Sequence, residues 1–445
     1  MKREHGLKIA LYLQTKEAKI KNAFDKAMRI VKESTADILV FPEDCYTPFT
    51  NKFKSYDLFN EKHKQKIIVK CSALSKRIGK SVIVSSQDSN GVIFSLYANA
   101  FAKRGETHHA VYVKHTMTGR SAMEEEHNYC ETYKTYFQPI ILKKHRIGMT
   151  ICHDCTQSLF SRMFGLNGVD ILINSTGHEV VYAKWHRYNQ ARAIENNCYV
   201  FVTMGREEIN KNCSCVLGFS PQGQDLKPQF LYQDGKQGNK PGSMLGGIYI
   251  YDIQSKGIYT ECKTVKKTVN EHSQFKIPVQ DSMSILKKTQ KISNKIHILK
   301  LKNMNIVMCL VRGNDIMKPE KVLPFLYAKE LKEFNNKRYI IINSHQKIDN
   351  DFYQQQLSAI LRVRAMENFC AVLVTSKNII DCYQSGKCKT SQILAPSRGF
   401  YKIDLNRAGG PESIWANQWG TNKRWRKNVE YLINELSTQS HNNAY

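Results

Sequence analysis

The amino-acid sequence predicts a layered α/β fold in its first part. Strand-like apolar runs alternate with stretches whose apolar residues recur at spacings of three and four, as on one face of a helix. The run LKIALYLQT at 7–15 precedes such a helical stretch around 20–31, and the strand-like DILVF at 37–41 follows. A second helical stretch at 61–78 leads into SVIVSS at 81–86, which is rich in β-branched residues. Strands that alternate with helices are typical of sheets covered by helices.

The length of the chain predicts more than one domain. Its 445 residues exceed what a single hydrophobic core usually supports. We expect the α/β domain to occupy residues 1–255. The stretch 256–295 is polar, lysine-rich and weakly periodic, which is typical of a linker or excursion. Residues 296–445 then form a second part, and its share of the net positive charge is larger than its share of the residues.

The composition excludes several classes of protein. Apolar residues make up 42% of the chain, which is enough for globular cores. No apolar run approaches the ~18 residues that span a bilayer, and the start, MKREHGLK, lacks the apolar segment of a signal peptide. We therefore expect a cytoplasmic protein with no membrane partner. The 13 cysteines are scattered, so we expect neither a disulfide framework nor a metal site, and no cofactor.

Three short blocks place a carboxylate, a cation and a thiol at the ends of expected strands. The apolar run at 38–41 is followed by Glu43, an extended stretch leads into Lys114, and the apolar run at 147–151 ends at Cys152. A carboxylate can act as a base, an ammonium group can stabilise negative charge, and a thiol is a nucleophile. The three blocks therefore predict covalent catalysis with Cys152 as the attacking group.

These blocks resemble the catalytic segments of the nitrilase, or carbon-nitrogen hydrolase, superfamily. LVFPE at 39–43, YVKHT at 112–116 and GMTICHD at 148–154 are similar to its three catalytic blocks in order and spacing. The resemblance covers roughly residues 7–253. It implies a four-layer αββα sandwich and a homo-oligomer, since this superfamily joins sandwiches into extended layers. Further similar blocks are LKIALYLQT, YANA, VDILINST, ARAIENNCYVFVT and FSPQG.

The resemblance implies a role for each of the three side chains. Glu43 takes the thiol proton, because a neutral thiol is a poor nucleophile at its unperturbed pKa of ~8.5. Lys114, together with the backbone N–H after Cys152, stabilises the negative charge that forms during attack. The expected substrate is a small molecule with an amide-like carbon–nitrogen bond, cleaved through a thioester. Amide hydrolysis is favoured over nitrile hydrolysis by analogy with the superfamily.

A second glutamate often supports the lysine in this superfamily. Within MEEEHNYCE the family spacing best fits Glu126, although a solvated acidic loop would have the same composition. After the CHD triplet the chain departs from the family's arginine-aromatic-proline-acid run, so no particular substrate is assigned. His153 follows Cys152 directly, and the alternation of side chains along a strand would turn it away from the thiol.

The second part contains an internal similarity to the first. ARAIENNCYVFVT at 191–203 is matched by VRAMENFCAVLVT at 363–375. We interpret residues 296–405 as a degenerate, partial second nitrilase-like unit, followed by a basic C-terminal helix. This unit has no counterpart of the glutamate or lysine blocks, so we expect it to be structural or regulatory. The shorter matches are ILINST with IIINSH, and MTIC with IVMC, which ends at Cys309.

Two other classes of function stay open. An amide-transfer enzyme would use the same three residues but would need a second acceptor pocket. A catalytically silent protein would instead bind nucleic acid or another polyanion through its basic second part, since the net charge is +27 and residues 423–427 read KRWRK. The same segment suits the solvated face of a terminal helix, which we favour. The intact set of three catalytic residue types argues against a silent site.

Overall fold

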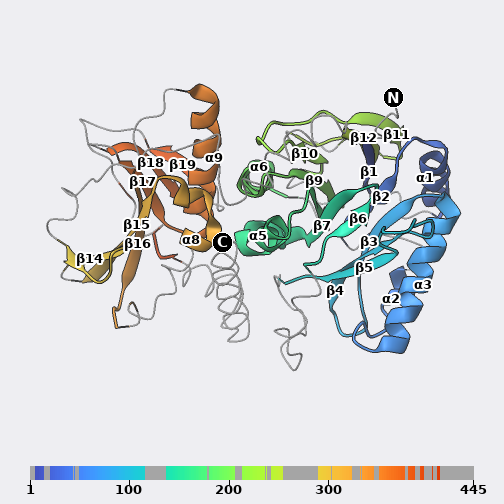
Figure 1. The fold of residues 1–445 in the computed structure, drawn as a ribbon, viewed down its shortest axis with the longest axis horizontal. Helices are drawn as coiled ribbons and strands as arrows, with labels where there is room; N and C mark the ends of the chain where they lie inside the picture. The colour runs from blue at the N-terminus through green and yellow to red at the C-terminus, as the bar shows by residue number, and fades with distance from the viewer. Residues whose placement is uncertain are drawn as a thin grey trace. The chain divides into compact units, whose positions relative to one another are not determined.

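The chain divides into two compact units in the computed structural model, Met1–Val269 and Asn270–Tyr445 (Figure 1). The division falls within the expected linker at 256–295, most of which lies outside the described residues, so its boundaries stay a prediction. The structure describes residues 6–14, 21–43, 45, 50–115, 137–177, 180–205, 213–235, 237, 242–253, 289–301, 303–322, 331, 333–344, 350–375, 379–385, 391–394, 403 and 408–410.

The first unit contains a seven-stranded mixed sheet in the order β11-β12-β1-β2-β3-β4-β5. Strands β1, β2 and β3 run parallel, and the outer pairs are antiparallel. The interior strand β1 is buried along nearly all of its length, as a strand covered on both faces must be. The strands are β1 (Leu7–Leu13), β2 (Ile38–Val40), β3 (Ser81–Gln87), β4 (Ile93–Ala98), β5 (His109–Val113), β11 (Gln229–Gln233) and β12 (Gly247–Ile253).

A second sheet of five strands has the order β10-β9-β8-β7-β6. Its three central strands, β7, β8 and β9, are parallel, and an antiparallel strand closes each edge. The loops that follow parallel strands lie at one edge of the sheet, which gathers the residues after β7 and β8 in one place. The strands are β6 (Ile140–Leu142), β7 (His145–Ile151), β8 (Ile171–Thr176), β9 (Tyr199–Met204) and β10 (Leu217–Phe219).

Helices cover the outer face of each sheet, so the unit has four layers (Figure 1). The longest helix, α3, begins at Asn60, whose side chain accepts a hydrogen bond from the His63 backbone N–H at 3.2 Å. It ends at Gly79, which takes the left-handed conformation that glycine adopts readily. This arrangement confirms the predicted αββα sandwich. The helices are α1 (Lys21–Glu33), α2 (Thr50–Phe53) and α3 (Glu61–Ile78) on the first sheet, and α5 (Ser158–Leu166) and α6 (Tyr182–Asn196) on the second.

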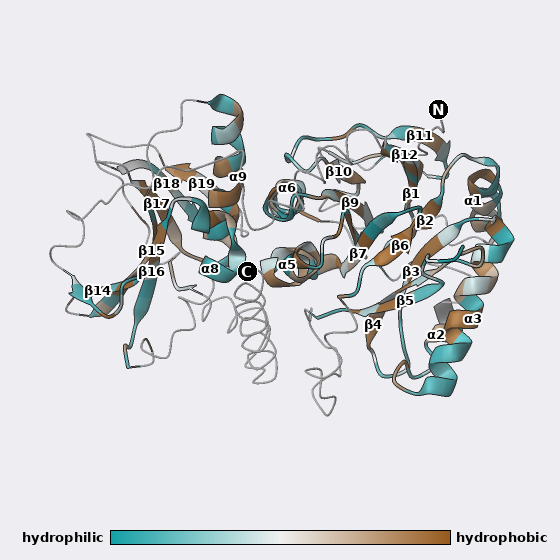
Figure 2. Ribbon diagram, viewed as in Figure 1, coloured by the Kyte–Doolittle hydropathy of each residue, from teal (hydrophilic) through white to brown (hydrophobic). Residues whose placement is uncertain are grey.

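Apolar side chains hold the layers together. Figure 2 shows that hydrophobic residues concentrate on the strands, while α3 carries hydrophilic residues as well. Between the first sheet and its helices, the rings of Phe24 and Phe41 stack with centroids 6.0 Å apart. Between the two sheets, the ring of Phe201 meets that of Tyr251 at 4.9 Å. Burying each such ring contributes roughly 1.5–3 kcal/mol.

The second unit is built on one seven-stranded sheet in the order β13-β14-β15-β16-β17-β18-β19. Strands β15, β16 and β17 are parallel, and the other neighbours are antiparallel. The strands are β13 (Gln290–Lys291), β14 (Ile296–Leu301), β15 (Met304–Arg312), β16 (Lys337–Ser344), β17 (Ala371–Thr375), β18 (Ile379–Ser385) and β19 (Ser391–Leu394), and the helices are α8 (Pro319–Val322) and α9 (Asp351–Glu367).

One expected match between the two parts is wrong in its register. Cys309 lies inside β15, pairs with Ile341 and is fully buried, and burial raises its pKa to about 12. The strand continues to Arg312, and a 3-10 turn, η4 (Gly313–Met317), follows. Gly313, and not Cys309, therefore stands at the strand end. The basic segment 423–427 lies outside the described residues. Among the described helices, none combines the length and apolar composition needed to cross a bilayer.

Gly218 tests the packing between the two sheets of the first unit. A Cβ atom at this position would lie 2.5 Å from the ring of Tyr251, which is too close for any real contact. Gly218→Ala should therefore lower the free energy of unfolding by about 1–3 kcal/mol, measured by urea denaturation. As a control, Lys62→Ala on the exposed side of α3 should change it by less than about 0.5 kcal/mol. Equal stability of Gly218→Ala and the parent chain would contradict the described sheet packing.

Candidate active site

Three predicted residues meet between the two sheets of the first unit. Glu43 follows β2 and Lys114 follows β5, both in the first sheet, whereas Cys152 follows β7 in the second. The Lys114 ammonium Nζ donates to Glu43 Oε1 at 2.7 Å, and the two side chains are 4% and 5% exposed. Cys152 is buried and interacts electrostatically with both. The structure therefore brings together a carboxylate, a cation and a thiol that lie far apart in the sequence.

A second hydrogen bond fixes the Glu43 carboxylate. Its other oxygen, Oε2, accepts from the backbone N–H of Gly177, just after β8, at 3.0 Å. A Cβ atom on Gly177 would approach that oxygen to 3.2 Å, so glycine lets the backbone come this close. With one oxygen on Lys114 and the other on Gly177, the carboxylate has a defined orientation.

Cys152 sits on a sharp turn at the end of β7. Its φ of 47° lies in the left-handed region, which costs a residue with a side chain about 1–3 kcal/mol unless its surroundings hold it there. The turn continues as the 3-10 segment η2 (Cys152–Thr156). Asn174 of β8 supports it, because its Nδ2 donates to the Cys152 carbonyl oxygen at 3.3 Å. The backbone thus presents the thiol at the sheet edge.

Asp154 links this turn to the lysine strand, and sequence reasoning missed it. Its buried carboxylate accepts from the Tyr112 hydroxyl at 2.9 Å and from the His115 backbone N–H at 3.2 Å, which flank Lys114. It also accepts from the Ile151 N–H at 3.3 Å, immediately before Cys152. One side chain therefore sets the spacing between the cation and the nucleophile. The signal was present as the aspartate of the CHD triplet.

Residues 8–218 match the model of the family described as carbon-nitrogen hydrolase. The first unit, called the hydrolase domain below, belongs to the carbon-nitrogen hydrolase family. The match confirms the predicted family and the hydrolase class for the domain. No curated protein matches the chain.

Several solved structures are similar to the hydrolase domain. An amidase from Nesterenkonia sp. is 16% identical with a TM-score of 0.40, and the match covers 60% of this chain and 97% of that one. A carbon-nitrogen hydrolase from Helicobacter pylori is 14% identical with a TM-score of 0.42, covering 61% and 97%. A member of branch 10 of the nitrilase superfamily from Saccharomyces cerevisiae has the same identity, score and coverage.

The electrostatics of the hydrolase site favour a neutral thiol beside a charged lysine. Burial raises the pKa of Cys152 well above its usual value, and the charge of Glu43 adds to this while Lys114 opposes it. Burial alone would lower the pKa of Lys114, but Cys152 and Glu43 outweigh burial and raise it. The resting site therefore holds a thiol and an ammonium group. Attack by sulfur must then be accompanied by proton transfer to a base.

His153 does not lie where strand alternation would put it. Its Nδ1 is 3.4 Å from the Cys152 Sγ, and its ring meets Trp185 edge-on at 5.0 Å. The expectation that it points away is wrong, because Cys152 begins a 3-10 turn and does not continue the strand. Cys155 on the same turn is buried, and its carbonyl oxygen accepts from Arg192 Nε at 2.8 Å. Glu126 lies outside the described residues, so its role stays a prediction.

Aromatic rings enclose His115, the residue after Lys114. Its ring lies 5.1 Å from Tyr112, 5.2 Å from Phe137 and 4.8 Å from Phe160. Burial lowers the pKa of His115 to about 3. The imidazole is therefore neutral at physiological pH and acts as an aromatic wall beside the lysine strand.

The neutral His115 should make the hydrolase domain sensitive to acid. Below pH 6.5 the unfolded chain binds a proton at this residue while the folded chain does not, so stability falls as the pH drops towards 3. The slope from one such group is at most about 1.4 kcal/mol per pH unit. His115→Phe should remove this contribution, and urea unfolding between pH 7 and 4 would measure the difference in slope.

A second cluster residue provides the control for this pH effect. Phe137→Leu disturbs the same packing without removing a titrating group. It should therefore lower the free energy of unfolding by an amount that does not change with pH. If His115→Phe and Phe137→Leu show the same pH slope as the parent chain, His115 is not held neutral by burial.

Proposed function

We propose that the hydrolase domain cleaves the amide bond of a small molecule through a thioester on Cys152. The observation that carries this proposal is the buried Lys114–Glu43 contact of 2.7 Å beside a thiol held on a strained turn. A buried ion pair is costly to place, because each charge loses its hydration. Such a pair next to a nucleophile is a common property of catalytic sites.

In the first step the Cys152 sulfur attacks the amide carbonyl carbon. Glu43 takes the thiol proton as the carbon–sulfur bond forms, which avoids a free thiolate in a buried site. The carbonyl oxygen becomes negatively charged, and the Lys114 ammonium group stabilises that charge, with the His153 backbone N–H as a second donor. Donors that are fixed before the reaction act strongly, because they need no rearrangement when charge develops.

In the second step the tetrahedral intermediate collapses to a thioester. Glu43 returns the proton to the leaving nitrogen, so the carbon–nitrogen bond breaks and a neutral amine or ammonia departs. Water then attacks the thioester carbonyl while Glu43 takes its proton, and the carbon–sulfur bond breaks to regenerate the thiol. One water is consumed, and the products are a carboxylic acid and an amine.

Among the described residues, Glu43 is the carboxylate that can relay protons in amide hydrolysis. Glu43 makes hydrogen bonds to Lys114 and Gly177, so it faces the reacting centre in one orientation throughout. Each proton that it accepts is released in the following step, first to the leaving nitrogen and then to the sulfur. A nitrile would need a further water and a further proton before the nitrogen could leave. The preference for amides over nitriles itself rests on analogy with the superfamily.

Substitution of the three residues tests the proposal. Cys152→Ala should abolish turnover of small amides such as acetamide, butyramide and benzamide, measured by release of ammonia. Glu43→Gln and Lys114→Met should each reduce kcat by at least about 10²-fold, because the three groups act as a unit. A panel of amides is used since the preferred acyl group is not assigned.

Two cysteine variants serve as matched controls. Cys155→Ser lies on the same turn and Cys309→Ala lies in the second unit, and neither should reduce kcat by more than a few-fold. Undiminished ammonia release by purified Cys152→Ala would rule out the thioester. If the parent chain hydrolyses nitriles but no amide, and Cys152→Ala loses the nitrile activity, the choice of amides as the substrate class is wrong.

A further inference from the structure

The sheet of the second unit repeats the order of the five-stranded sheet in the hydrolase domain. There, β6 is antiparallel to β7, the strands β7, β8 and β9 are parallel, and β10 is antiparallel to β9. In the second unit, β14 to β18 have the same directions in the same order. Each unit also has a 3-10 turn after the first parallel strand and a long helix before the third.

Side-chain contacts fix the register of this repeat. Asn343 Nδ2 donates to the Gly313 carbonyl oxygen at 3.2 Å, as Asn174 does to Cys152. Gly313 has the same φ of 47° as Cys152. Arg364 Nε donates to the Ile316 carbonyl oxygen at 3.0 Å and pairs with Glu367, as Arg192 does with Cys155 and Glu195. Gly313 therefore occupies the place of the nucleophile, and Asp315 the place of Asp154.

In the hydrolase domain, the space beside Asp154 is filled by the end of β5. Asp154 accepts from Tyr112 and from the His115 N–H, and the His115 ring packs between Phe137 and Phe160. This segment carries the catalytic lysine. The described sheet of the second unit has no strand that corresponds to β5.

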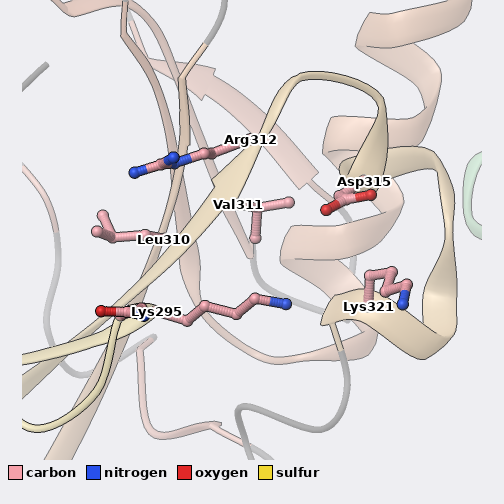
Figure 3. Close-up of a pocket in the computed structure, with 7 residues that line it drawn as sticks. Lys295, Leu310, Val311, Arg312, Asp315 and Lys321 are labelled. Carbon is pink, nitrogen blue, oxygen red and sulfur yellow. The ribbon is translucent and has the colours of Figure 1, made fainter. Parts of the chain in front are cut away.

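The corresponding space in the second unit is a cavity of about 160 Å³ (Figure 3). By the register of the repeat, Asp315 replaces Asp154, and Lys321, six residues further on, replaces Phe160. Strand pairing fixes the register of the edge strand: His297 pairs with Met308 as Ile140 pairs with Ile147. Lys295, two residues before His297, therefore corresponds to Gln138. The lining residues are Asn294, Lys295, Leu310, Val311, Arg312, Asp315 and Lys321.

Three lining positions of this cavity carry a positive charge that their counterparts in the hydrolase domain lack. Lys321 stands where the hydrolase domain has Phe160, Lys295 where it has Gln138, and Arg312 where it has Ile151. Figure 3 shows the Lys295 side chain reaching towards the side of the cavity where Asp315 and Lys321 lie, with Arg312 at the opposite edge. The lining thus carries three cations and one carboxylate, with Lys295 and Lys321 on the side of Asp315, and this net positive charge favours a negatively charged occupant.

We propose that this cavity binds a small oxyanion that also carries an O–H or N–H donor. The cationic side chains would hold the oxygens by charge-assisted hydrogen bonds. Asp315 would accept from the donor, as Asp154 accepts from the Tyr112 hydroxyl. The volume is that of roughly five water molecules, which suits hydrogen phosphate or a small hydroxy acid. This proposal does not depend on the amidase activity of the first unit.

Hydrogen phosphate and sulfate are matched probes for this site. Both are tetrahedral oxyanions, but hydrogen phosphate has an O–H group and sulfate has none. Calorimetric titration of the full chain at pH 7.4 and constant ionic strength should show saturable binding of phosphate, at least tenfold tighter than that of sulfate. Asp315 can accept a hydrogen bond from the O–H group of phosphate, whereas sulfate offers it no donor, which explains the expected preference.

Three variants separate the roles of the cavity residues. Lys321→Gln should weaken phosphate binding at least tenfold, and Lys295→Gln should do the same if Lys321→Gln fails to fold. Asp315→Asn should reduce the preference for phosphate over sulfate to less than threefold. Lys300→Gln, an exposed position on β14 outside the cavity, removes the same charge and should leave affinity unchanged within twofold.

Two results would contradict the proposed oxyanion site. Absence of saturable phosphate binding up to 10 mM contradicts it. Phosphate binding that survives in both lysine variants is adventitious and also contradicts it. Cys152→Ala should bind phosphate like the parent chain, so loss of amidase activity and loss of this site can be told apart. Thermal unfolding of each variant confirms that it is folded.

Discussion

The buried contact between Lys114 and Glu43 is the interaction on which the rest of the site depends. Placing a carboxylate and an ammonium group out of water costs several kcal/mol per ion, and their attraction offsets this only with good geometry and further hydrogen bonds. The structure supplies both, through the 2.7 Å contact and the Gly177 N–H on the second oxygen. This requirement explains why the ends of three strands meet so closely between the two sheets.

The turn at Cys152 is the second constraint, and the two units treat it differently. In the hydrolase domain a residue with a reactive side chain occupies a left-handed conformation, supported by Asn174 and Asp154. In the second unit Gly313 has the same φ without the steric cost, because glycine lacks a Cβ atom. The strained backbone is thus present at Cys152, the proposed nucleophile, and absent at Gly313. The supporting hydrogen bond is present in both units, donated by Asn174 to Cys152 in the first and by Asn343 to Gly313 in the second.

Much of this candidate site could be predicted from the sequence, because the three proposed catalytic residues follow apolar runs that end abruptly. Glu43, Lys114 and Cys152 were placed correctly at strand ends for this reason. The direction of His153 could not be predicted, since nothing in the residue pattern distinguishes a strand from a strand that bends into a 3-10 turn. Cys309 was misplaced because the apolar run around it continues to Val311, so a match of four residues could not locate the end of the strand. The role of Asp154 arises from contacts across the fold.

The central claim is that Lys114 and Glu43 make Cys152 the reactive thiol of this chain. Its most direct test is alkylation by 2-chloroacetamide at pH 7, followed by peptide mapping with mass spectrometry, because it needs no known substrate. The account predicts that Cys152 is modified first among the ten described cysteines, all of them buried, and that Lys114→Met slows this modification at least tenfold. Preferential modification of another cysteine, or an unchanged rate in Lys114→Met, would contradict the account.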